Sequence, residues 1–203
     1  MNILLSLFGA VSQGLTWTTF ALGVFITFRI LNIADLTCEG SFALGGSISA
    51  ILVVIFDVNP YLSLIVSLLG GMAAGLVTGL LHTKLKIPSI LSGILTMFGL
   101  YSINLKIMGQ PNVSLINKPT MISIIKDKLP EAEELGVRDY TLQTGVVFVV
   151  SLLFSLAAIA FLYWLFGTEI GSCVRATGNN ETMVRAQGVN TDMTKIIGLA
   201  ISN

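Results

Sequence analysis

Charged side chains are scarce in this sequence, and that scarcity sets the first limit on what the protein can be. Only 11% of the 203 residues are charged, whereas a soluble domain of this size carries about 25%. Basic and acidic residues balance, so the formal net charge is zero. A neutral chain has no electrostatic attraction to nucleic acid or to an acidic partner, and we expect neither.

Residue types that support catalysis, redox chemistry or metal binding are also few. His82 is the only histidine, and the two cysteines, Cys38 and Cys173, form no CxxC pair. We therefore predict no metal site, no cofactor, no disulfide and no Ser/His/Asp constellation. No GxxxxGK(S/T) phosphate-binding loop occurs, so any ATP hydrolysis requires a separate chain. We expect the protein not to be an enzyme.

Long apolar runs are what the sequence does have. Hydrophobic residues make up 54% of the chain, and the mean hydropathy is +0.86. A run of about twenty apolar residues spans the hydrocarbon core of a bilayer as a helix. We predict an all-α, polytopic transmembrane bundle with five complete spans at residues 3–28, 40–56, 61–81, 89–108 and 145–166. A partial sixth span begins near Met193 and stops at Asn203, so we expect residues 1–203 to be one C-terminally incomplete membrane domain.

Basic residues in the short loops predict the orientation. The loop at residues 82–88 contains Lys84 and Lys86, whereas the turn at residues 57–60 contains no lysine or arginine. Because short cytoplasmic loops are enriched in basic residues, the first loop is predicted to lie inside. By alternation, Arg29 and residues 167–192 are also cytoplasmic. The N-terminus and residues 109–144 are then outside, the latter with a short amphipathic helix at 121–129 ended by Pro130.

Small residues at helical spacing predict close helix crossings. Apolar burial cannot drive helices together in lipid, so association depends on close backbone approach at small side chains. Two such stripes occur, one in each of two neighbouring spans: Gly71, Gly75 and Gly79, and Ser41, Gly45 and Ser49. Glycine is common in membrane helices, but a doubled GxxxG on one face favours packing.

Polar residues precede the second span. Asp35 and Glu39 are four residues apart, with Asn32 one turn earlier, and so are expected on one helix face. Charges in a bilayer usually line a cavity or lie at the interface. Two interpretations stay open. These residues lie near a translocation path or gate, or Asn32 or Asp35 caps the helix at the cytoplasmic interface.

A short helix is predicted within residues 167–192. Asn180 is a good N-cap and Gly188 a good C-terminal stop, which delimits a helix at residues 181–187. Met183, Ala186 and Gln187 share one of its faces. From the residues alone, this segment either docks on a partner through that face or simply connects two spans.

Two segments resemble a known family. The loop contains the pattern Thr168-x-x-Gly171-x-x-x-Arg175-Ala176, then Asn179 or Asn180, Ala186 and Gly188-Val189-Asn190-Thr191-Asp192. This pattern is similar to the cytoplasmic loop of ABC-importer permease subunits of the branched-chain amino-acid type. Residues 31–42 resemble a subgroup usually paired with a lipoprotein binding protein. Some of its members are assigned to tryptophan or other aromatic amino acids, and family members usually continue for further membrane helices.

The resemblance implies a role for the cytoplasmic loop, residues 167–192, and a set of partners. In that family this loop holds the coupling helix, which docks on a separate ATPase subunit. The implied coupling residues are Arg175, Asn180, Glu181, Met183, Val184, Arg185, Ala186 and Gly188. The implied partners are two copies of an ATP-binding subunit, a second permease subunit (a homodimer) and an extracytoplasmic substrate-binding lipoprotein. We expect a multi-pass permease in the lipid bilayer of the cytoplasmic membrane, importing a small solute such as an amino acid.

Two other functions fit the same spans. An ion-gradient-driven secondary transporter would use Asp35 and Glu39 as coupling carboxylates, and its uptake would survive ATP depletion. A non-transporting membrane scaffold would have no solute. Of the three, only the importer predicts an ATPase that copurifies with the chain.

Overall fold

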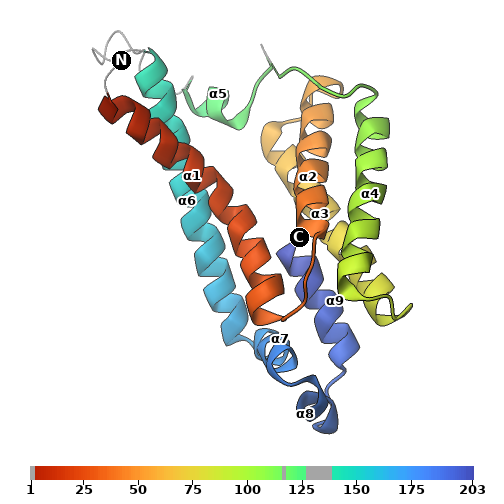
Figure 1. The fold of residues 1–203 in the computed structure, drawn as a ribbon. Helices are drawn as coiled ribbons and strands as arrows, with labels where there is room; N and C mark the ends of the chain where they lie inside the picture. Colours follow the sequence, from red (N-terminus) through yellow and green to blue (C-terminus); the bar gives the residue numbers. More distant parts are fainter. Residues whose placement is uncertain (1–2, 116–117, 127–138) are drawn as a thin grey trace.

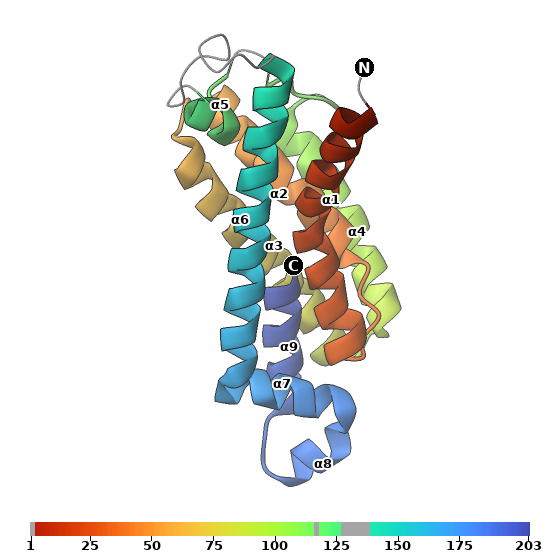
Figure 2. The same cartoon turned by 90° about the vertical axis from the view of Figure 1, so that its left-hand side faces the viewer.

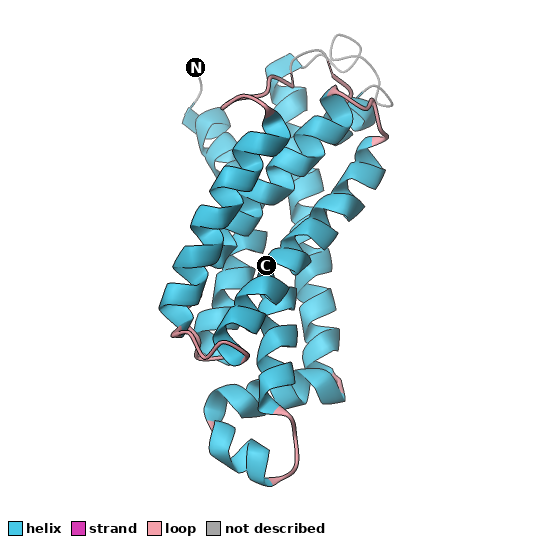
Figure 3. Cartoon of the chain, turned by 90° about the vertical axis from the view of Figure 1, so that its right-hand side faces the viewer, coloured by secondary structure: helices cyan, strands magenta, loops and turns pink. Residues whose placement is uncertain are grey.

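The computed structural model describes residues 3–115, 118–126 and 139–203. All regular structure in this part of the chain is helical (Figure 3). The long helices are α1 (Ile3–Phe25), continued by a π-helical turn η1 (Ile26–Ile30), α2 (Thr37–Val54), α3 (Pro60–Thr83), α4 (Ser89–Met108) and α6 (Asp139–Gly167). The shorter helices are α5 (Met121–Lys126), α7 (Glu169–Asn179), α8 (Glu181–Ala186) and α9 (Thr191–Ser202).

Five of these helices are long and apolar enough to cross a membrane, which confirms the predicted polytopic all-α bundle. Their boundaries differ from the sequence-based ones mainly at polar ends. The helix predicted from residue 40 begins at Thr37, and the one predicted from residue 145 begins at Asp139. The predicted partial sixth span corresponds to α9. Helix α5 covers part of the predicted segment 121–129, whose end at Pro130 lies outside the described residues.

The long helices form two groups (Figures 1 and 2). Helices α1 and α6 lie side by side, joined by the aromatic pair Phe8 and Phe148, whose centroids are 4.8 Å apart. The Ser155 hydroxyl of α6 also donates to the Leu15 carbonyl of α1 at 3.1 Å. Helices α2, α3 and α4 pack together as the second group. Helix α9 packs on α3 and contacts α1 and η1, so it links the two groups.

The loops alternate between the two ends of the bundle as the span order requires. Helix α5 and the turn between α2 and α3 lie at the upper end in Figure 1. The turn between α3 and α4, η1, α7 and α8 lie at the lower end. The lower end therefore gathers Arg29, Lys84 and the 167–192 loop, which the basic-residue pattern assigns to one side. Which end faces the cytoplasm stays a prediction.

Helix α2 begins inside the bundle and not at its end (Figure 1). The non-helical residues 31–36 lead from the lower end of α1 up to the first turn of α2. Leu31, Ile33 and Asp35 in this segment are 3%, 7% and 2% exposed. The Ile33 N–H donates to the Thr27 carbonyl at 2.9 Å. Irregular backbone at membrane depth is tolerated only where protein buries it or where it lines a cavity. This segment therefore has to be held by its neighbours.

Glycine brings α3 into backbone contact with α9. A Cβ atom added at Gly71 would lie 2.5 Å from the Asn203 carbonyl oxygen, and one added at Gly75 would overlap the Leu199 carbonyl oxygen. At Gly79 it would lie 2.9 Å from the Ile196 Cα. The glycine stripe thus faces α9 along its whole length, a partner that the sequence did not indicate.

The small residues of α2 contact two different helices. Gly45 faces Ser67 of α3, and the Ser49 hydroxyl lies 3.1 Å from the Ser63 hydroxyl of α3. Ser41, one turn before Gly45, instead donates to the Asn203 side chain at the end of α9, at 2.8 Å. The stripe therefore joins α2 to α3 at one end and to α9 at the other.

Candidate functional site

Helix α7 covers the lower end of the first helix group, and it was not predicted as a helix from the sequence. The Thr168 hydroxyl caps its first turn by accepting from the Gly171 N–H at 3.3 Å. A Cβ at Gly178 would overlap the Ile30 carbonyl oxygen, so α7 presses against η1. Arg175 donates to the Phe166 carbonyl at 2.9 Å. Its guanidinium carbon lies 6.0 Å from the centroid of the Phe166 ring. Arg175 therefore neutralises the carbonyl end of α6 and lies on α7, not on α8.

Helix α8 has the start and stop that the sequence predicts. The Asn180 side chain accepts from the Met183 N–H at 3.0 Å and from the Thr182 hydroxyl at 2.7 Å. Gly188, at φ +85°, takes the left-handed conformation that ends a helix without steric strain. The helix is one residue shorter than predicted, ending at Ala186.

Charged side chains fasten α8 to the first turns of α9. Glu181 accepts from Lys195 at 2.8 Å and from Arg185 at 3.0 Å. Arg185 also donates to the Thr191 hydroxyl at 2.8 Å and lies 3.4 Å from Asp192. We call Glu181, Arg185, Thr191, Asp192 and Lys195 the α8–α9 clasp. The hydrogen bond from Lys195 is the largest cause that lowers the pKa of the Glu181 carboxyl below its ordinary 4.5.

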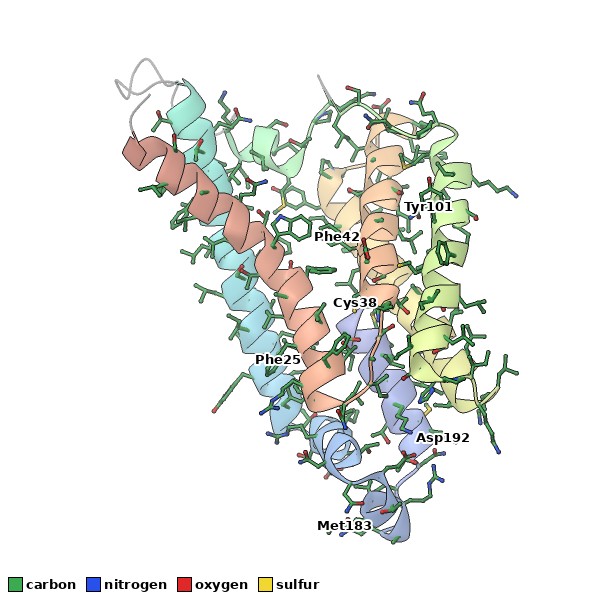
Figure 4. The ribbon with its side chains drawn as sticks, viewed as in Figure 1. Phe25, Cys38, Phe42, Tyr101, Met183 and Asp192 are labelled. Atoms are coloured by element: carbon green, nitrogen blue, oxygen red, sulfur yellow. The ribbon has the colours of Figure 1, made fainter. Side chains whose placement is uncertain are left out.

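The clasp leaves one face of α8 open. Val184 is 5% exposed and points inward, whereas Met183 is 57% exposed. Ala186 and Gln187 are exposed beside it. Helix α8 projects beyond all the other helices at the lower end, with Met183 near its tip (Figures 2 and 4). The face formed by Met183, Ala186 and Gln187 is thus presented on a helix that is fixed from behind.

The lowered pKa of Glu181 predicts how the clasp responds to acid. A carboxylate whose folded-state pKa is depressed contributes stability above its ordinary pKa, and that stability is lost as the pH falls through the folded-state pKa. Amide hydrogen exchange in α8, corrected for the intrinsic rate, is expected to accelerate across that acidic window. In a Glu181→Gln variant the exchange should already be fast at neutral pH and should not change in that window. A wild-type helix insensitive to this acidification would contradict the assigned role of the clasp.

A buried polar junction holds the start of α2. Asp35 accepts from the Thr37 N–H at 2.8 Å and from the Asn203 side-chain amide at 2.9 Å. The Thr37 hydroxyl lies 2.7 Å from the Thr78 hydroxyl of α3. The Thr78 hydroxyl donates in turn to the Thr96 hydroxyl of α4 at 2.9 Å. These bonds join four helices at the depth where the backbone is irregular. Asn203, Thr78 and Thr96 were not singled out from the sequence; their only signal is that they are polar residues within apolar runs.

The prediction that Asp35 and Glu39 share one helix face is wrong. Helix α2 begins only at Thr37, so Asp35 belongs to the non-helical segment before it, where it is 2% exposed. Glu39 lies in the first turn of α2 and is exposed, as is Asn32, which adopts a positive φ of 54°. Asp35 does accept from the first helical N–H, as a capping residue would, but it does so inside the bundle.

Removing the Asp35 carboxylate should loosen this junction. In Asp35→Ala the Thr37 N–H loses the Asp35 acceptor in a water-poor site, and the Asn203 amide keeps only its bonds to Leu199 and Ser202. The free energy of unfolding is therefore expected to fall by about 1–3 kcal/mol. Asp35→Asn keeps one acceptor oxygen and should lose less. Thermal unfolding of the purified variants in detergent measures both. Equal stability of the alanine variant and the wild type would contradict the junction.

Comparison with known proteins places this multi-pass helical membrane protein in a family. Residues 6–203 match the family described as "Branched-chain amino acid transport system / permease component". The chain belongs to this family. No solved structure shows significant similarity to it.

Relatives of the chain are named as transport permeases. It is 36% identical to a tyrosine transport system permease protein of Clostridioides difficile, over 95% of this chain and 59% of that protein. It is 26% identical to a probable branched-chain amino acid transport permease of Methanocaldococcus jannaschii, over 96% of this chain and 61% of that protein. It is 27% identical to the ribose import permease of Escherichia coli, over 95% of this chain and 56% of that protein. The chain thus spans about three-fifths of the length of these relatives.

Proposed function

We propose that the chain is the membrane-spanning permease subunit of an ATP-binding-cassette importer, with α8 as the helix that contacts the ATP-binding subunit. The observation that carries this proposal is the geometry of α8. It is capped by Asn180, fastened to α9 by the clasp, and presents Met183 at the lower end of the bundle. A six-residue helix has little stability of its own, so a fixed and exposed one is suited to receive a partner.

The clasp gives this contact a route into the membrane. Movement of α8 is transferred to α9 through the Glu181–Lys195 ion pair. Helix α9 then acts on α3 through the glycine stripe, and on the start of α2 through Asn203. Rigid helices that meet at their backbones transmit displacement with little side-chain relaxation, because packed interiors are not easily compressed. ATP-driven closure of the partner would in this way reach the junction around Asp35.

The partners follow from this role. Two ATP-binding subunits, a second copy of the permease and an extracytoplasmic lipoprotein that delivers the solute complete the importer. The lower end, with residues 167–192, faces the cytoplasm of a bacterial-type membrane, and the N-terminus and residues 109–144 face outside, where the lipoprotein docks. The solute is an amino acid. The similarity to a permease named for tyrosine supports an aromatic one.

Purification of the native complex tests the proposal. The chain is extracted under mild conditions from membranes, and bound proteins are assayed for ATP hydrolysis. An ATPase that copurifies with the chain is the expected result. A complex without any ATPase, combined with uptake that collapses with an ionophore, would instead favour an ion-driven transporter. Asp35 fits that alternative poorly because both of its oxygens already accept hydrogen bonds.

A further inference from the structure

Glu39 is a carboxylate inside the membrane-spanning part of the protein that has no partner among the residues the structure describes. It lies in the first turn of α2, which begins within the bundle, and its side chain is exposed. No described residue forms a hydrogen bond or an ion pair with it, in contrast to the neighbouring Asp35. An ionised group at this depth is tolerated where it faces a water-filled path or a cation. Glu39 therefore needs an explanation that packing does not supply.

A cavity lies beside Glu39, between α2 and α4. Its volume is about 230 Å³, and its walls include Glu39, Ala43, Met97, Phe98, Tyr101 and Asn104. The two helices are in close contact at Gly40, where an added Cβ would lie 3.1 Å from the Met97 Cα. The cavity therefore opens beside this contact. It combines apolar walls with a small number of polar groups, as binding sites for small molecules do.

Asn104 contributes a second unpaired acceptor to this cavity. The residue is 8% exposed, and its side-chain oxygen Oδ1 is buried without a hydrogen-bond donor among the described residues. A buried amide oxygen without a donor is destabilising. Oδ1 itself is not accessible from the cavity that Asn104 lines, and rotation of the side-chain amide by 180° would turn this oxygen towards a donor there.

We propose that Glu39 and Asn104 bind the ammonium group of a transported solute, with Tyr101 beside them. The two side chains offer a negative charge and a hydrogen-bond acceptor, and the cavity contains no basic residue. A primary ammonium supplies the matching positive charge and three donors. A divalent metal ion would need more oxygen ligands than this cavity offers. The inference rests on the proposed transport function and assigns the residues that recognise one end of the solute.

The surroundings of Glu39 suit an aromatic solute. About 230 Å³ is smaller than the roughly 300–1,000 Å³ of sites for whole drug-sized ligands, so the cavity accepts the ammonium end and the adjoining atoms. Phe98 and Tyr101 of α4 line the cavity together with Glu39. Their rings can contact an aromatic side chain and stabilise a cation at their faces. Outside the cavity, Phe42 of α2 stacks on Trp17 of α1 with centroids 5.5 Å apart, and both residues are 52% exposed.

Ligand protection of an engineered cysteine tests the site. Ala43→Cys is introduced together with Cys173→Ser into the full-length permease in its complex, and its rate of maleimide labelling is measured. Tyramine, which has an aromatic ring and an ammonium group, is expected to slow labelling by about tenfold at saturation. The probe 3-(4-hydroxyphenyl)propionate, which has no ammonium group, should not slow labelling.

Adding Glu39→Gln should raise the tyramine concentration needed for half-maximal protection by about tenfold or more. Glu39→Asp should retain part of the protection. Glu169 is an exposed carboxylate of α7, so Glu169→Gln is the matched control. In this variant tyramine should protect the cysteine as well as it does in the parent.

Three results would overturn the assignment. Equal protection by the two probes would show that the ammonium group is not recognised, and unchanged protection in Glu39→Gln would remove the carboxylate from the site. An Ala43→Cys variant that resists labelling without any ligand would mean that another helix covers the cavity. ATP-driven uptake is measured on the parent complex in parallel. If tyramine protects the cysteine but the complex shows no ATP-driven uptake, only the proposed function is contradicted. If the complex shows ATP-driven uptake but tyramine does not protect the cysteine, only the ammonium site is contradicted.

Discussion

Met183→Asp is expected to reduce solute uptake by at least about tenfold while the protein still inserts and the complex still hydrolyses ATP. Met183 is 57% exposed on the open face of α8 and makes no contact that the fold needs. A charge placed at the centre of a desolvated contact typically weakens binding by more than about 2 kcal/mol. The loss should therefore appear in the coupling of hydrolysis to transport. Uptake and ATPase rates of reconstituted vesicles measure the two separately.

Met193→Asp provides the matched control for this prediction. Met193 is 56% exposed, close to the value for Met183, but lies in the first turn of α9 beyond the open face of α8. The same change of charge there should leave the ratio of uptake to hydrolysis unchanged. Arg185→Glu should also uncouple the two activities, by a different route, because it places a third carboxylate beside Glu181 and Asp192. Normal uptake in Met183→Asp would contradict the role of α8.

Gly75→Val is expected to destabilise the bundle by about 1–3 kcal/mol or more, because overpacking displaces backbone. Any Cβ at this position overlaps the carbonyl oxygen of Leu199 and would lie 2.9 Å from the Ala200 Cα. Since the obstacle is backbone, a side-chain rotation cannot relieve it. Helix α9 would have to move away from α3 and would draw Asn203 away from Asp35. Thermal unfolding in detergent and the uptake rate should both fall.

Gly99→Val is the control for the change from glycine to valine. A Cβ at Gly99 of α4 meets no atom within 4 Å, so the variant introduces the same side chain without a clash. Its stability should stay within about 0.5 kcal/mol of the wild type, as for a surface position. If both variants lost the same stability, the effect would belong to valine in a membrane helix and not to the contact between α3 and α9.

Local features of the sequence predicted the spans and the ends of α8. Helix α4 was placed at its observed bounds, and in the structure Pro88 precedes it and Gly109, at φ +67°, ends it. Asn180 and Gly188 delimited α8 by the same kind of short-range chemistry. Apolar length and capping act within a few residues, so one sequence is enough to recognise them.

Contacts between distant parts of the chain were beyond such patterns. Asp35 and Asn203 are 168 residues apart, and nothing local indicates that they bind one another. Helix α7 was missed because it is short and polar and contains Gly171 and Gly178, which suggest a loop. In the structure both glycines lie at backbone contacts, with Leu165 and Ile30 respectively. A glycine required by close packing is indistinguishable in one sequence from a glycine required by a turn.

Labelling and cross-linking from α8 test directly whether this helix contacts the ATP-binding subunit. Met183→Cys is prepared with Cys173→Ser, and its reaction with a membrane-impermeant maleimide is measured in right-side-out and inverted vesicles. Labelling is expected in inverted vesicles only, together with a cross-link from this position to the ATP-hydrolysing subunit that depends on the state of its nucleotide. Labelling from the outer surface would place α8 where no such subunit can reach it, and the proposed function would not survive that result.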